Sequence, residues 1–92
     1  MPDYWIKISE TEEDERTYHN YLITAKDRRE ARSLAMTFME RFIDYDADPD
    51  KIENGFVFCN NAIFVRLVAI KETTKEEFKE FLLKTHTINM SS

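Results

Sequence analysis

The chain has 92 residues and a formal net charge of −5, and 42% of its residues are hydrophobic. That length suits one domain, and the apolar share is that of a folded protein rather than a disordered one. A single glycine excludes glycine-rich phosphate loops, and the lone Cys59 excludes an internal disulfide. No apolar run is long enough to span a membrane and residues 1–3 do not begin a signal peptide, so we expect a cytoplasmic protein with no membrane partner.

The start of the chain predicts a β-hairpin. Residues 4–9 alternate between apolar and polar side chains, and residues 17–25 are rich in the residue types that favour strands. Residues 10–16 between them carry five acidic residues and one basic residue, so we expect a solvated loop there. The connection is short and polar, which is typical of antiparallel neighbours.

The strongest periodic pattern predicts a helix from about residue 27 to residue 43. Asp27 stands three residues before Glu30, and an aspartate in that place accepts hydrogen bonds from the unpaired N–H groups of the first turn. Residues 44–54, which include Pro49, are expected to be a loop. Apolar residues at helical spacing predict one buried face, formed by Ala31, Leu34, Ala35, Phe38, Met39, Phe42 and Ile43.

The second half predicts another hairpin and another helix. Gly55 opens a strand over residues 56–59, and Asn60 and Asn61 supply a turn, because asparagine tolerates the left-handed backbone region. Residues 62–70 are apolar except for Arg66, which predicts a central strand covered on much of both faces. The second helix begins near Thr74, which has capping-box spacing to Glu77.

The element order β-β-α-β-β-α predicts an α+β fold. We expect a four-stranded, mainly antiparallel sheet with both helices packed on one face. Residues 1–86 should form this single domain, and residues 87–92 should be a frayed C-terminal tail.

The negative charge is concentrated in two segments. Residues 10–16 and residues 44–53 contribute −4 each, so the rest of the chain sums to +3. The second segment has alternating aspartates, as calcium loops do, but Pro49 and Gly55 break the EF-hand pattern, so a solvated loop is preferred to a weak divalent site. The first segment is typical of a solvated tip. The alternative is that both acidic segments imitate the charge of a nucleic-acid backbone or dock on a basic partner. The acidic residues of the first segment are Glu10, Glu12, Glu13, Asp14 and Glu15.

Three arginines, Arg28, Arg29 and Arg32, fall in the first turns of the predicted helix. Cations there oppose the helix dipole, at a cost of about 0.3–1 kcal/mol each when exposed. Ion pairs with the acidic hairpin would offset that cost. A phosphate, an acidic partner or the acidic loop of a second copy would do the same, so all three are candidate partner-binding residues.

Strand alternation assigns side chains to two faces of the sheet. Aromatic rings interleaved with cations on an open face can stack bases or form a protein interface. The acidic balance of the chain favours a protein, and Trp5, Tyr18 and Arg66 are candidate contact residues. If Ile6, Ile8, Tyr21, Ile23, Val65 and Leu67 face the helices, the opposite face carries Trp5, Lys7, Tyr18, Leu22, Phe64 and Arg66.

Catalysis has little support in the residues. His19, His86 and Cys59 fall in separate predicted elements, and no H-E-x-x-H, C-x-x-C or G-x-S-x-G motif occurs. Cys59 fits a small buried residue of a strand better than a nucleophile. We therefore expect no enzyme activity, no catalytic residue, no cofactor and no metal site.

In general character the chain resembles the small acidic accessory proteins of bacteriophages and mobile elements. The likeness lies in its size, dense aromatics, single cysteine, acidic loops and the strand-to-helix passage YLITAKDRREA, residues 21–31. The resemblance implies binding to a host or defence protein, often with inhibition and sometimes by imitating the charge of DNA. It carries over no functional residue.

Three functions remain open. The first is a non-enzymatic protein-binding module, such as an inhibitor, that uses the acidic loops or the outer sheet face. The second is a nucleic-acid-associated protein that uses the three helix-start arginines and Lys7 with Trp5. The third is a self-associating structural subunit, such as a homodimer, in which the basic helix start meets an acidic loop of a neighbour.

Overall fold

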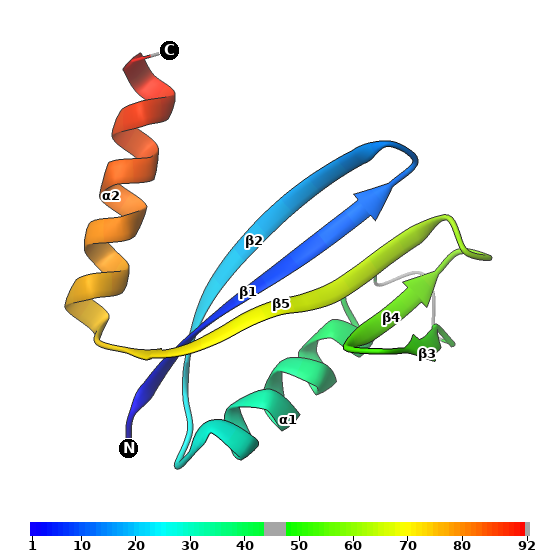
Figure 1. The fold of residues 1–92 in the computed structure, drawn as a ribbon, viewed down its shortest axis with the longest axis horizontal. Helices are drawn as coiled ribbons and strands as arrows, with labels where there is room; N and C mark the ends of the chain where they lie inside the picture. The colour runs from blue at the N-terminus through cyan, green and yellow to red at the C-terminus, as the bar shows by residue number, and fades with distance from the viewer. Residues whose placement is uncertain (44–47, 92) are drawn as a thin grey trace.

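The computed structural model describes residues 1–43 and 48–91, with side chains described as far as residue 84. Five antiparallel strands form one sheet in the order β2-β1-β5-β4-β3. We call the sheet face toward α1 the inner face and the opposite face the outer face (Figure 1). In chain order the elements are β1 (Asp3–Glu12), β2 (Glu15–Thr24), α1 (Arg28–Glu40), β3 (Asp50–Ile52), β4 (Gly55–Phe58), β5 (Ile63–Thr73) and α2 (Lys75–Ser91).

The predicted α+β class and antiparallel sheet are confirmed, but the sheet has five strands rather than four. The additional strand, β3, lies in the segment predicted to be a loop. Ile52 of β3 pairs with Gly55 of β4 across a two-residue turn, in which Asn54 has a φ of 62°. Gly55 has to be glycine, because a Cβ atom there would run into the carbonyl oxygen of Val65 on β5. The division into a domain of residues 1–86 and a frayed tail stays a prediction.

The acidic segment of residues 10–16 is not a loop, as had been expected. β1 and β2 pair from Asp3 with Thr24 as far as Glu12 with Glu15, so only Glu13 and Asp14 form the turn. The expectation failed because a strand end that projects into solvent needs no packed side chains. Acidic residues can therefore occupy the last rungs of the hairpin.

The core lies between the inner face and α1. Asp27 caps the helix as predicted, and its carboxylate accepts a hydrogen bond from the Glu30 N–H at 2.8 Å. The buried residues of α1 are Ala31, Ala35 and Met39.

The predicted apolar face of α1 is only partly buried. Leu34 and Phe38 are 46% and 43% exposed. Their exposure follows from the position of α2, which does not pack beside α1 as expected.

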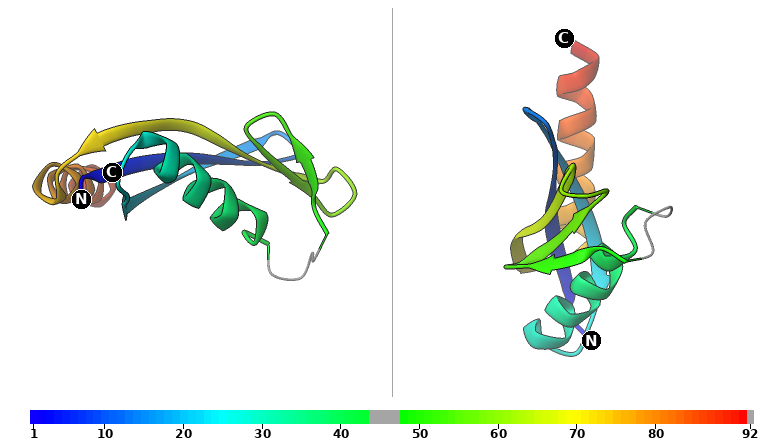
Figure 2. Two further views of the ribbon diagram at one scale, coloured as in Figure 1. Left: turned by 90° about the horizontal axis from the view of Figure 1, so that it is seen from below. Right: turned by 90° about the vertical axis from the view of Figure 1, so that its right-hand side faces the viewer.

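The two helices do not pack side by side on one face of the sheet. α2 lies at one end of the sheet (Figure 2), where it contacts Trp5 of the outer face: the Trp5 ring centroid is 5.7 Å from that of Phe78 and 4.4 Å from that of Phe81. The predicted cap is present, since the Glu77 N–H donates to Thr74 Oγ1 at 3.1 Å. No helix in the described part of the chain is long and apolar enough to cross a membrane.

One extra residue in β5 decides which side chains face α1. β5 pairs with β1 along its length except at Val68, between Leu67 and Ala69. Such a bulge shifts the alternation of side chains by one residue. Leu67 and Ile70 are therefore both buried against the inner side, whereas Ala69 and Lys71 are exposed on the outer face.

We predict that Met39→Ala destabilises the protein far more than Leu34→Ala. Met39 is fully buried, so its truncation should lower the free energy of unfolding by about 2–5 kcal/mol. Leu34 is half-exposed and should lose about 1 kcal/mol or less. Urea denaturation measures both values, and equal losses would contradict the burial described for α1.

Candidate functional site

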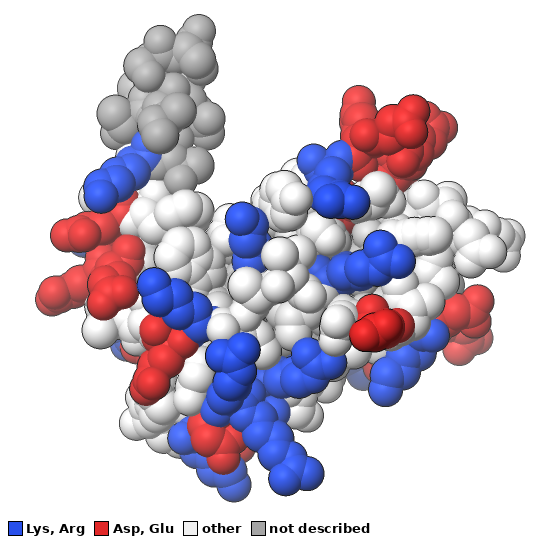
Figure 3. Space-filling view, viewed as in Figure 1, with Lys and Arg blue, Asp and Glu red and all other residues white. Residues whose placement is uncertain are grey.

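The outer face gathers cationic and aromatic side chains from β1, β2 and β5. Figure 3 shows Lys and Arg distributed across this face, and the largest groups of Asp and Glu at the β1–β2 tip and beside α2. The central part of the outer face carries no acidic side chain from these three strands. We define it by residues that alternate outward: Trp5, Lys7, Ser9, Thr11, Tyr18, Asn20, Leu22, Phe64, Arg66, Ala69 and Lys71.

Two cations on this face lie over aromatic rings. Lys7 Nζ is 4.6 Å from the centroid of the Tyr18 ring, and Arg66 Cζ is 5.2 Å from the centroid of the Phe64 ring. Each contact contributes about 0.5–1 kcal/mol at an exposed site and orients a long, charged side chain. Within the described residues neither cation forms a salt bridge with a carboxylate. Both positive charges therefore remain available to a ligand or partner.

Trp5 is fixed from two sides. Its Nε1–H donates to Asn20 Oδ1 at 2.8 Å, and its ring packs against Phe78 and Phe81. This predicted contact residue therefore anchors α2 instead of offering an open ring for stacking. The other two predicted residues of the face are accessible: Tyr18 is 47% exposed, and Arg66 is exposed.

A hollow of about 310 Å³ opens between Trp5, Lys7, Ala69 and Lys71. The small side chain of Ala69 leaves room between the two lysines. The hollow combines apolar surface with two ammonium groups, so it can accept a carboxylate together with apolar atoms. Lys71 and Ala69 were not among the residues predicted from the sequence, because their outward position depends on the bulge at Val68.

The predicted acidic contact residues lie in two different surroundings. Glu10 is on the inner side of β1, where its Oε1 lies 2.9 Å from His19 Nε2, and the His19 ring packs against Phe42. This residue has an internal partner. The other four are exposed at the hairpin tip: Glu12, Glu13, Asp14 and Glu15.

The three arginines of α1 do not form the ion pairs considered for them. Arg28 Nη1 donates to the carbonyl oxygen of Ile70, and Arg32 Nη2 donates to Asn54 Oδ1, both at 2.8 Å. Arg29 is exposed. The acidic hairpin tip cannot reach these side chains, because α1 follows the end of β2 that is farthest from the turn.

The residues considered for catalysis or metal binding belong to separate elements. Cys59 lies in the turn between β4 and β5 with a φ of 56°, and not in a strand as predicted. Among the described residues, no three His, Cys, Asp or Glu side chains gather as a metal site. Residues 44–47 of the alternating-aspartate segment and the side chain of His86 lie outside the described part. The lack of enzyme activity stays a prediction.

The chain matches no protein-family model, no curated protein and no solved structure. The chemistry of its own surface is therefore the basis for any functional conclusion.

The hydroxyl of Tyr4, next to the start of α1, has a perturbed pKa. Burial raises this pKa above the usual 10.0, the charges of Glu72 and Asp27 raise it further, and Arg28 opposes them. A raised tyrosine pKa gives stability that is fully present below about pH 10 and is lost as the pH rises through the folded-state value.

We predict that Tyr4→Phe reduces the loss of stability above pH 10 relative to the native chain. Urea denaturation at neutral pH and at alkaline pH measures the effect, and Tyr18→Phe, at an exposed position, is the control. An unchanged pH dependence in Tyr4→Phe would show that the hydroxyl is not in a desolvated position.

The contact between α2 and the sheet predicts a fluorescence response from Trp5, the single tryptophan. Phe81→Ala should shift its emission to longer wavelength and increase its quenching by acrylamide, because a ring that shields it is lost. Leu82→Ala, at a neighbouring position that is 47% exposed, should change neither. If the two variants respond equally, α2 does not pack on Trp5 through this face.

Proposed function

We propose that the chain is a non-enzymatic protein-binding module whose outer face binds an acidic surface of a partner protein. The observation that carries this proposal is the pair of lysines, Lys7 and Lys71, at an open hollow, with Arg66 on the same face and no salt bridge from Lys7 or Arg66 among the described residues. Complementary charge steers two proteins together and fixes the register in which they meet.

The composition of the outer face supports a protein as the partner. Tyr18 and Phe64 supply aromatic area, and Arg66 supplies a planar group that pairs with carboxylates. The centres of protein interfaces are enriched in aromatic residues and arginine and depleted in acidic residues. The outer face has this composition, and its rings are already ordered by cation contacts, which lowers the entropy lost on binding.

The two ends of the face favour a protein over a nucleic-acid strand. One end is the acidic hairpin tip, and the other is the start of α2, where three glutamates stand against Lys75 and Lys79. Figure 3 shows acidic groups at both ends. A polyanion longer than the face would be repelled, most strongly at the hairpin tip. A protein surface with an acidic centre and basic margins would be attracted along the whole length, so nucleic-acid binding is the alternative and not the first choice.

An inhibitory role, which the resemblance to phage accessory proteins implies, is part of this proposal. If this chain covers the acidic surface of a partner, other basic ligands cannot bind there. In this arrangement the acidic hairpin tip lies at the margin of the contact and does not act as a mimic of DNA.

Photo-crosslinking from two positions tests the proposal. A benzophenone side chain replaces Phe64 on the outer face or, as a control, Leu34 on the helix at the inner face, and adducts formed in cells are identified by mass spectrometry. We expect one protein to form an adduct with position 64, and we expect no adduct of that protein with position 34. Arg66→Glu should abolish the adduct, whereas Lys51→Glu should not, because Lys51 pairs with Phe56 and lies on the other face.

The remaining outcomes separate the alternatives. A nucleic-acid adduct from position 64 would contradict a protein partner and support the nucleic-acid alternative. An adduct with a second copy of this chain would support the self-associating subunit. Equal adducts from both positions, or no adduct from either, would contradict the proposal that the outer face is the binding surface.

A further inference from the structure

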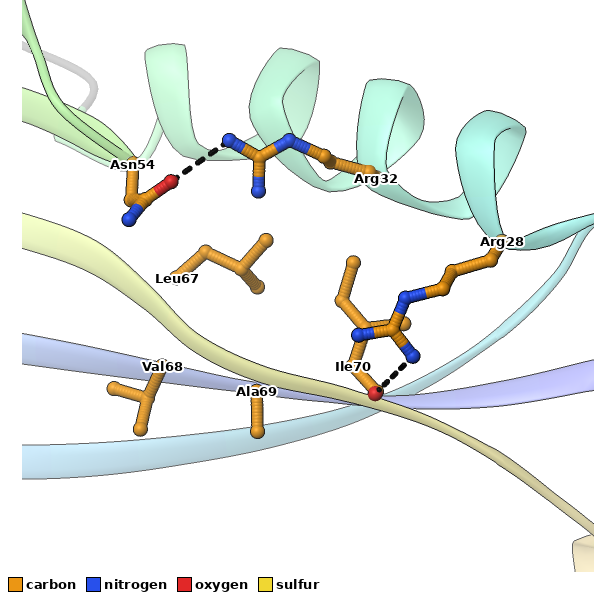
Figure 4. Close-up of a pocket in the computed structure, with 7 residues that line it drawn as sticks. All are labelled: Arg28, Arg32, Asn54, Leu67, Val68, Ala69 and Ile70. Atoms are coloured by element: carbon orange, nitrogen blue, oxygen red, sulfur yellow. Dashed lines mark hydrogen bonds between the residues drawn. The ribbon is translucent and has the colours of Figure 1, made fainter.

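A second hollow, of about 170 Å³, lies where α1 begins beside β5 (Figure 4). β4 pairs with β5 only as far as Arg66, so the rest of this edge of β5 has no neighbouring strand among the described residues. The hollow opens at that edge and adjoins the outer face at Ala69. Its lining residues are Arg28, Arg32, Asn54, Leu67, Val68, Ala69 and Ile70.

Two guanidinium groups flank this hollow with donors to spare. In Figure 4 the side chains of Arg28 and Arg32 reach from α1 toward β5, on either side of the space above Leu67. Each forms one hydrogen bond of 2.8 Å, to the Ile70 carbonyl oxygen and to Asn54 Oδ1 respectively. A guanidinium has five N–H donors, so each retains several for a ligand.

The positive charge of this hollow is not neutralised by its lining. Both hydrogen-bond acceptors are neutral groups, and no carboxylate is among the residues that line the hollow. The start of α1 adds the positive end of the helix dipole. Asp27 and Glu72, whose charges act with that of Arg28 on Tyr4, do not line the hollow, and Asp27 is held as the helix cap by the Glu30 N–H. An anion between the arginines would relieve the repulsion that this arrangement creates.

We propose that this hollow binds a phosphoryl group, either as inorganic phosphate or as the end of a phosphate monoester. Two guanidinium groups match the charge of a phosphate dianion and its several acceptor oxygens, whereas one carboxylate would neutralise only one of them. The volume is below the roughly 300 Å³ at which pockets for whole small molecules begin, so the site takes the phosphoryl end only. This inference does not depend on the outer face binding a protein.

The existing hydrogen bonds favour such a ligand. Contacts to Ile70 and Asn54 hold the two arginines at the hollow before the ligand arrives, which reduces the ordering that binding requires. The peptide groups of Asn54 and Ile70 should therefore report occupancy.

Titration of the full chain with inorganic phosphate at constant ionic strength tests the proposal, followed by NMR amide shifts. We expect saturable shifts at Asn54 and Ile70. Arg28→Gln and Arg32→Gln should each weaken binding roughly tenfold or more, as expected for the loss of hydrogen bonds to a charged group. Arg29→Gln is the matched control, because Arg29 is exposed on the same turn and does not line the hollow.

The arginine geometry has its own test. Arg32→Lys keeps the charge but loses the planar donor pair, so it should also weaken phosphate binding while leaving the thermal midpoint near that of the native chain. This variant separates loss of the site from loss of the fold.

A comparison of anions distinguishes phosphate from general anion attraction. The affinity for inorganic phosphate should rise as the pH increases through about 7, where its dianion forms, and the affinity for a phosphate monoester should rise through about 6. Sulfate is a dianion throughout this pH range, so its affinity should show no such rise. Asp27 and Glu72, which act with Arg28 on Tyr4, would affect the binding of both anions. The sulfate titration therefore serves as the control for their contribution.

A titration with O-phosphoserine, compared with that of inorganic phosphate, identifies the source of the phosphoryl group. Tighter binding than inorganic phosphate would assign the site to a phosphoryl group on a larger ligand, and weaker binding would assign it to the free ion. Non-saturating shifts, or equal weakening by Arg29→Gln, would overturn the proposal.

Discussion

The unpaired Val68 in β5 determines the two faces of the sheet. If Val68 were paired like its neighbours, strict alternation would turn Ile70 outward and Lys71 toward the core, where a desolvated ammonium is strongly unfavourable. Because Val68 is left unpaired, Ile70 faces α1 and Lys71 borders the outer hollow. The carbonyl of Ile70 is also exposed at the free edge, where Arg28 binds it. The core, the outer face and the arginine hollow therefore depend on one irregularity of the backbone.

Local patterns explain how much of this fold could be predicted. The α+β class, the division of β1 and β2 into two faces, and the caps at Asp27 and Thr74 follow from residue types at fixed spacing. The bulge does not, because the apolar run from residue 67 to residue 70 fits more than one register. A signal was nevertheless present: Arg66 and Lys71 are an odd number of residues apart in a largely apolar strand. Both can lie on the same face only if one residue between them is not paired.

The position of α2 and the distribution of charge were beyond the reach of local patterns. An apolar stripe on a helix does not say which sheet face it covers, and here that choice depends on contacts between Trp5 and the rings of Phe78 and Phe81. Similarly, a net charge of −5 argues against anionic ligands only if charge is evenly spread. On the face shown in Figure 3, the largest groups of acidic side chains lie at the hairpin tip and beside α2, and Lys and Arg are distributed between them. The candidate site is therefore basic on an acidic protein.

Placing lysine at residue 69 or residue 70 tests this account most directly. Because Val68 is unpaired, Ile70 is buried and Ala69 is exposed, whereas strict alternation from Leu67 would place them the other way round. Ile70→Lys should therefore lower the free energy of unfolding by about 3 kcal/mol or more, or abolish cooperative unfolding, because it buries an unpaired ammonium group. Ala69→Lys, the control, should cost about 0.5 kcal/mol or less, because its side chain projects into solvent. Urea denaturation followed by Trp5 fluorescence measures both variants. Equal losses, or a larger loss for Ala69→Lys, would show that the bulge does not organise the sheet.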